Sequence, residues 1–99
     1  MLEAYLLSLT GRIFKVLPMR EQQEQGDAVY LDLYLDSLSL EIHGACDTFP
    51  CLRVCSDYIM VLNTVNGLCA DTPLPFLKRE VFKMLSAIDR IWDEYGGDK

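Results

Sequence analysis

Histidine and cysteine are the residues of this chain best suited to metal chemistry, and four of them lie close together in its middle. They are His43, Cys46, Cys51 and Cys55. A zinc site brings four such ligands to about 2.0–2.3 Å from the ion, but the common Cys-x₂-Cys spacing is absent. On a helix, Cys46 would face the core and His43 would lie roughly 60° away, on the outer face. These residues are a weak zinc candidate, and we expect free thiols, an exposed histidine, no bound metal and no cofactor.

Catalytic arrangements are equally incomplete. A cysteine nucleophile would need His43 as a base and a third group to orient it, for which Asp47 is the nearest residue. Asp32 and Asp36 are four residues apart, but two carboxylates supply too few ligands for a divalent ion. The carboxylate pair is typical of a solvated helix face. The sequence therefore predicts a protein that is not an enzyme.

A short basic strip near the C-terminus is formed by Arg79, Lys83 and Arg90. Asp89 and Asp93 adjoin the strip and weaken its field, which favours ordinary surface ion pairs. The net charge of −6 disfavours direct binding to nucleic acid or to an anionic membrane. One alternative is that an acidic surface competes for the basic nucleic-acid-binding groove of a partner protein. The scattered distribution of the acidic residues makes this alternative less favoured.

The composition indicates one folded domain over residues 1–99. A hydrophobic share of 51% excludes disorder. The apolar runs are much shorter than the ~20 residues that cross a bilayer. The start of the chain has no secretory pattern, because Glu3 interrupts it. We therefore expect a cytoplasmic protein.

The four cysteines are expected to be reduced thiols, since nothing in the sequence indicates secretion. Cys46 and Cys69 lie near apolar stripes and are expected to be small core residues. The pattern leaves open the exposure of Cys51 and Cys55.

Residues 31–49 give the clearest structural signal. At about 100° per residue, their apolar side chains share a sector of about 120° that no polar side chain enters, which predicts an amphipathic helix. The alternative is an α+β fold with a hairpin over 29–42. In such a hairpin, the alternation of inward and outward side chains would have to reverse at Asp36-Ser37. The segment also lacks the glycine or asparagine that a tight two-residue loop prefers. The stripe comprises Leu31, Tyr34, Leu35, Leu38, Ile42, Ala45, Cys46 and Phe49.

Similar apolar spacing predicts a first helix over about 2–17, ended by Pro18. Residues 19–26 would be a frayed continuation or the longest exposed loop. Asp27 is the expected N-cap of the central helix, which ends at 48–50.

A third, short helix is expected to begin with Ser56 as its cap. Prolines within 71–75 precede a last helix whose apolar positions run over 77–95 and which stops at Gly96-Gly97. Four amphipathic helices joined by short links predict an all-α fold, a small antiparallel bundle.

Several apolar residues miss these stripes. Leu7 and Phe14 lie to one side of the first stripe, Leu33 and Leu40 lie opposite the second, and Phe82 is displaced from the last. Either the central helix is buried on two sides, or some of these residues form exposed patches that contact a protein partner or a second copy. The candidate interaction surface comprises Leu7, Phe14, Leu33, Leu40, Arg79, Phe82 and Lys83.

The chain resembles small uncharacterised proteins carried by prophages and integrative elements of gut Firmicutes. The resemblance rests on the segments 11–18, 34–38 with 48–50, and 78–83, and it extends over most of the chain. It implies a bacterial, cytoplasmic setting and transfers no functional residue. The expected function is a non-catalytic protein–protein interaction module of a phage or mobile element, able to self-associate. The alternatives are an acidic inhibitor of the anti-defence type, which would occupy the nucleic-acid-binding site of a host protein, and a zinc-stabilised small domain.

Overall fold

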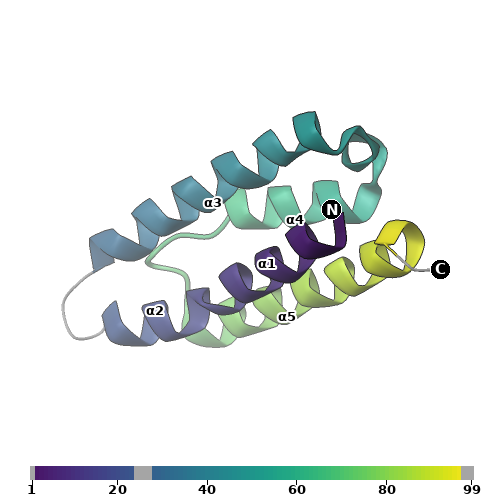
Figure 1. Ribbon diagram of the computed structural model, residues 1–99. Helices are drawn as coiled ribbons and strands as arrows, with labels where there is room; N and C mark the ends of the chain where they lie inside the picture. Colours follow the sequence, from purple (N-terminus) through teal and green to yellow (C-terminus); the bar gives the residue numbers. More distant parts are fainter. Residues whose placement is uncertain (1, 24–27, 97–99) are drawn as a thin grey trace.

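The computed structural model describes residues 2–23 and 28–96, which form a bundle of helices (Figure 1). No strand occurs in these two ranges, so the hairpin alternative over 29–42 is wrong and the all-α prediction is confirmed. A 3₁₀ helix (Pro50–Val54) and a π-helical turn (Trp92–Gly96) supplement the α-helices. The α-helices are α1 (Leu2–Phe14), α2 (Val16–Gln23), α3 (Ala28–Thr48), α4 (Ser56–Asn66) and α5 (Leu74–Ile91).

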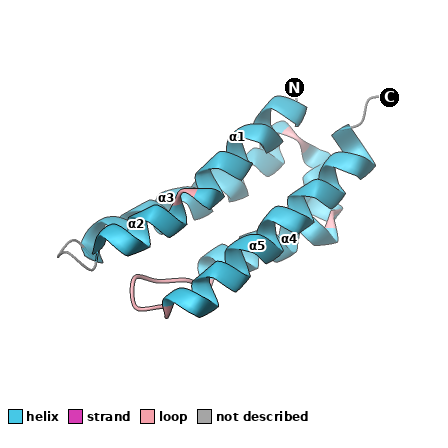
Figure 2. Ribbon diagram, turned by 90° about the horizontal axis from the view of Figure 1, so that it is seen from below, coloured by secondary structure: helices cyan, strands magenta, loops and turns pink. Residues whose placement is uncertain are grey.

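The helices run alternately up and down, as predicted. The pair α1–α2 makes one bent rod, which packs between α3 and α5, while α4 packs against α3 and α5 on the other side (Figures 1 and 2). The result is an elongated body of 45 × 22 × 20 Å. The bundle thus leaves one side of each rod free to meet solvent or a partner.

The first rod continues past Pro18, which corrects the prediction that this proline ends the helix. The two helices meet at Lys15, whose amide still donates to the carbonyl oxygen of Gly11, 3.1 Å away, and α2 then extends to Gln23. The proline ring has no N–H and crowds the carbonyl group one turn earlier, which bends a helix without having to end it. Val16 and Leu17 are buried, so core packing favours continuation. The remainder of the predicted 19–26 segment, and the Asp27 cap, lie outside the described residues.

The core follows the predicted stripes closely. On α3, Leu31, Leu35, Leu38 and Ile42 are each at most 3% exposed. The helix runs through Gly44 to Thr48 without ending early. On α5, the predicted stripe is buried from Leu77 to Ile91 except at half-buried Leu85, whereas Tyr95 beyond it is exposed. The proline at the second helical position is tolerated, as expected. The fully buried residues of α5 are Leu77, Val81, Met84, Ala87, Ile88 and Ile91.

A pair of tyrosines crosses the core between α1 and α4. Tyr58 is 1% exposed, and its hydroxyl group donates a hydrogen bond to the backbone carbonyl oxygen of Ile42, 2.5 Å away. The hydroxyl group of Tyr5 lies 2.8 Å from that of Tyr58 and therefore donates to it. The Tyr5 ring stacks on Phe49, with centroids 5.7 Å apart. These contacts fix α1, α3 and α4 at one end of the bundle.

The two ends of α4 each differ in one respect from the prediction. Ser56 is the first helical residue, and Cys55 occupies the N-cap without a side-chain hydrogen bond. Cys55 is 3% exposed and Cys69 is exposed, so the expectation that Cys69 is a core residue is wrong. Helix α4 ends at Asn66, before the apolar stripe could continue, and this early end leaves Cys69 in a loop.

The loop from Gly67 to Pro73 is tied to two other helices. The Asp32 carboxylate of α3 accepts a hydrogen bond from the Ala70 amide, 2.8 Å away. Arg20 of α2 donates to the carbonyl oxygen of Thr72, 3.1 Å away. Asp32 is therefore a structural residue and not only part of a solvated face.

Candidate interaction surfaces

Leu7 and Phe14 of α1 and Phe82 of α5 form an exposed apolar surface, which we name the α1/α5 face. Their exposed fractions are 68%, 49% and 52%. The rings of Phe14 and Phe82 meet edge to face, with centroids 6.3 Å apart and planes at 90°, a favoured geometry for aromatic pairs. Helices α1 and α5 run side by side (Figure 2). Residues from the two ends of the chain thus share one surface.

The sequence places each of these residues on its helix for a simple reason. Leu7 and Phe14 are seven residues apart, which is about two turns, so both lie on the same side of α1. Phe82 directly follows buried Val81 and is therefore turned about 100° from it. Spacing identified all three as lying outside the buried stripes. The contact between Phe14 and Phe82 depends on which helices are neighbours, which local spacing does not show.

Leu33 and Leu40 lie on a separate surface, the outer side of α3. They are 59% and 75% exposed, so the alternative that this helix is buried on two sides is wrong. Asp36 and Ser37 lie between them in sequence and are exposed. The four charged side chains of α3 are all carboxylates. This surface is therefore apolar and acidic.

The basic residues of α5 are largely neutralised by neighbours. Lys83 Nζ lies 3.0 Å from a carboxylate oxygen of Glu80, and Arg79 Nε lies 4.0 Å from the other one. The Arg79 guanidinium also lies 5.1 Å from the centre of the Phe76 ring. Arg90 pairs with Asp57 of α4 at 3.0 Å. Arg79 and Lys83 thus form ordinary surface pairs and leave no concentrated basic patch.

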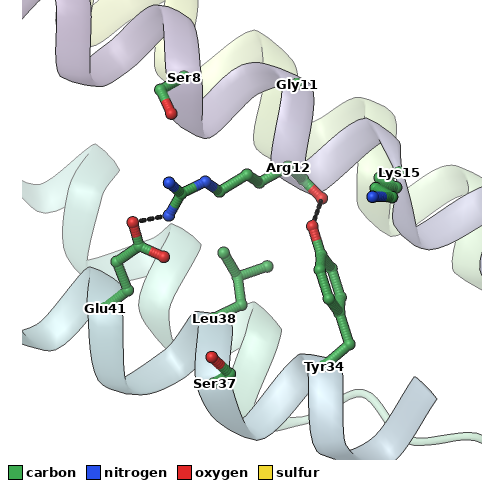
Figure 3. A pocket seen from close by; sticks show the side chains of 8 residues that line it. All are labelled: Ser8, Gly11, Arg12, Lys15, Tyr34, Ser37, Leu38 and Glu41. Carbon is green, nitrogen blue, oxygen red and sulfur yellow. Dashed lines mark hydrogen bonds and ion pairs between the residues drawn. The ribbon is translucent and has the colours of Figure 1, made fainter. Parts of the chain in front are cut away.

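A pocket of about 420 Å³ opens between α1 and α3 (Figure 3). Arg12 reaches across it and forms an ion pair with Glu41. The Tyr34 hydroxyl donates to the carbonyl oxygen of Arg12, 2.7 Å away. Partial burial raises the pKa of Tyr34 above its ordinary value. The lining residues are Ser8, Gly11, Arg12, Lys15, Tyr34, Ser37, Leu38 and Glu41.

The sequence did not predict this pocket, because its ion pair joins residues that are far apart in the chain. Arg12 is already neutralised by Glu41, which reduces its attraction for an external anion. The lining includes hydroxyl groups but no histidine or cysteine that could activate them. The geometry therefore supports a small cleft between two helices and offers no catalytic constellation.

A second pocket of about 340 Å³ contains His43 and Cys46 near the end of α3. Asp47, the group that could have oriented His43, instead accepts a hydrogen bond from Arg53 at 2.6 Å. Within residues 2–23 and 28–96, no three histidine, cysteine or acidic side chains are grouped to hold a metal ion. The structure therefore does not assemble the weak zinc candidate. Cys55 is buried in the core whereas His43 is exposed, which explains why they do not meet.

Comparisons of the chain with models of protein families, with curated proteins and with solved structures give no match. Among the described helices, none is both long and apolar enough to cross a membrane. A functional proposal must therefore be based on the surfaces of the chain itself. The α1/α5 face and the outer side of α3 are the two that carry large exposed apolar side chains from the predicted set.

Proposed function

We propose that this chain is a small, non-catalytic protein–protein interaction module of a bacterial phage or mobile element, acting in the cytoplasm through its α1/α5 face. The observation that supports this proposal best is the contact between Phe14 and Phe82, whose rings are each about half exposed. Two aromatic rings held by neighbouring helices form a preorganised anchor. Aromatic side chains are enriched in protein interfaces and often supply much of the binding free energy.

The charge of the surface also favours a protein partner. The whole chain has a net charge of −6, which opposes binding to nucleic acid. Lys78 and Asp89 of α5 are exposed and lie four residues before and seven residues after Phe82, so helical spacing adds one charge of each sign beside it. Contact there should depend mainly on apolar burial and only weakly on salt.

The acidic inhibitor is a weaker alternative. Of the carboxylates on α3, Asp47 pairs with Arg53, Glu41 pairs with Arg12, and Asp32 binds a loop amide. These contacts use negative charge within the protein, whereas a mimic of nucleic acid needs its charges directed at a partner. The inhibitor alternative also requires binding that weakens steeply with salt.

Site-specific photo-crosslinking in bacterial cells tests the proposal. The photoreactive amino acid p-benzoylphenylalanine would replace Phe82 in one variant and Asp36, on the outer side of α3, in a matched control. We expect covalent adducts from position 82, either with another protein or with a second copy. Mutation of Leu7 and Phe14 to serine should reduce those adducts. If position 82 gives no more adduct than position 36, the proposed docking through the α1/α5 face is wrong.

A further inference from the structure

Helix α5 presents a short pattern beside Phe82 that is complementary to itself. Lys78, Phe82, Leu85 and Asp89 are spaced by four, three and four residues, so they lie along one side of the helix. Lys78, Phe82 and Asp89 are exposed and Leu85 is half-buried. The stripe thus has an apolar centre, a positive end and a negative end.

Among residues 2–23 and 28–96, neither charged end of this stripe has a partner. In the described ranges, the side chains of Lys78 and Asp89 form no ion pair, whereas the other basic residues of α5, Arg79, Lys83 and Arg90, all do. A cation and an anion therefore flank the apolar centre, about 16 Å apart along the helix. Both charges are exposed and therefore accessible to a second molecule.

We propose that the partner of the α1/α5 face is a second copy of this chain, docked with the two α5 helices antiparallel across a two-fold axis. This inference rests on the proposed function and names its partner. An axis midway between Phe82 and Leu85 places each Phe82 against Leu85 of the other copy. The same axis places each Lys78 opposite Asp89 of the other copy, so two ion pairs form. A two-fold contact is self-complementary in this way.

Charge selects this surface over the outer side of α3. Two α3 helices facing one another would bring together carboxylates alone, because α3 contains no lysine or arginine. Helix α5 has four basic and two acidic residues, so it is the favourable place for two acidic copies to meet. Parallel docking of the α5 helices would instead place Lys78 against Lys78. The antiparallel arrangement is therefore the one that the charges favour.

The available area fits a weak dimer. An 18-residue helix is about 27 Å long, and two neighbouring helices about 10 Å apart present roughly 500–600 Å² per copy. That area lies near the lower limit for a specific interface, which typically buries over about 1,000 Å² in total. The apolar centre would supply most of the binding, and the two ion pairs would set the orientation.

Charge exchange tests the arrangement directly. Sedimentation equilibrium on the purified full chain, kept reduced, would measure dimerisation over about three decades of concentration around the micromolar range. We expect Lys78→Glu alone and Asp89→Lys alone each to weaken the dimer at least about tenfold, because each creates two like-charge contacts. An equimolar mixture of the two single variants should form a heterodimer. The double variant should recover the homodimer.

Two outcomes would overturn the inference. One is a wild-type chain that remains monomeric at every concentration. The other is a dimer whose stability is unchanged by Lys78→Glu and by Asp89→Lys but which is lost when Leu33 and Leu40 are mutated to serine. Circular dichroism of every variant separates a lost contact from a lost fold. If the chain is monomeric and photo-crosslinking at Phe82 captures a different protein, the second copy is ruled out and the proposed docking function stands.

Discussion

The hydroxyl group of Tyr5 lies 2.8 Å from that of Tyr58, although 53 residues separate them in the chain. Tyr58 is buried, and its hydroxyl group donates a hydrogen bond to the carbonyl oxygen of Ile42, 2.5 Å away. The two hydroxyl groups and the carbonyl group therefore form a short chain of hydrogen bonds. The sequence placed Tyr58 on the inner side of its helix for its apolar ring. Its hydroxyl is satisfied only because α1 and α3 approach it from two directions.

Replacing Tyr58 by phenylalanine should lower the free energy of unfolding by about 1–2 kcal/mol, because two hydrogen bonds near the core are lost. Urea denaturation monitored by circular dichroism measures the change. Tyr30→Phe is a matched control, since Tyr30 is 63% exposed and should lose almost nothing. Equal stability of the two variants would show that the Tyr58 hydroxyl contributes little.

Stability should fall in alkaline solution. Burial raises the pKa of Tyr58, and the contact with Tyr5 raises it further. Below pH about 10 the folded and unfolded chains both keep this proton, so the full stability is present. Above that pH the unfolded chain loses the proton first, and stability decreases by up to about 1.4 kcal/mol per pH unit for this one group.

Unfolding measured between about pH 8 and about pH 11 checks this dependence. The decline should be less steep in Tyr58→Phe than in the wild type. Burial also raises the pKa of Tyr5, so part of the decline should persist in the variant. Identical slopes in the two proteins would contradict the assignment to Tyr58.

Two helix glycines can be replaced with a gain in stability. A Cβ atom at Gly11 or Gly44 would meet no atom within 4 Å, and both residues lie inside helices. Alanine at either position should raise the free energy of unfolding by up to about 1 kcal/mol. Gly67→Ala is the comparison, because Gly67 follows the end of α4 and its Cβ would lie 3.6 Å from two carbonyl oxygens. A similar gain at all three positions would argue against the helix-propensity explanation.

Asp32 should be more important for stability than Asp36, although both are exposed on the same helix. Asp32→Ala removes the acceptor of the Ala70 amide and should cost about 1–2 kcal/mol. Amide hydrogen exchange at Ala70 should become faster. Asp36→Ala should change stability by less than about 0.5 kcal/mol. Unchanged exchange at Ala70 in the Asp32 variant would contradict the anchoring role.

The sequence was most informative where one pattern repeats over many residues. The stripe from Leu31 to Phe49 predicted α3, because each turn repeats the same apolar side. The prediction that Pro18 ends the first helix was wrong. Proline disfavours a helix interior, but the burial of Val16 and Leu17 favours continuation of the helix and outweighs this effect. Local patterns therefore gave the helices themselves and were less reliable at their ends.

The candidate site was predictable only in part. Spacing alone identified Leu7, Phe14 and Phe82 as apolar residues outside the core stripes. Their meeting on one surface, and the pairing of Arg12 with Glu41, depend on which helices are neighbours and how each is rotated. These are tertiary relationships, for which the apolar periodicity of single helices contains no information.

The different exposures of Cys55 and Cys69 allow transient opening of the α3–α4 connection to be followed by thiol labelling. Cys69 is exposed in the loop after α4, whereas Cys55 is 3% exposed at the start of that helix. A thiol reagent should modify Cys69 at once, and it should reach Cys55 only in molecules whose α3–α4 connection has transiently opened. Mass spectrometry of the two labelled positions would then measure how often the α3–α4 connection opens, without any mutation of the chain.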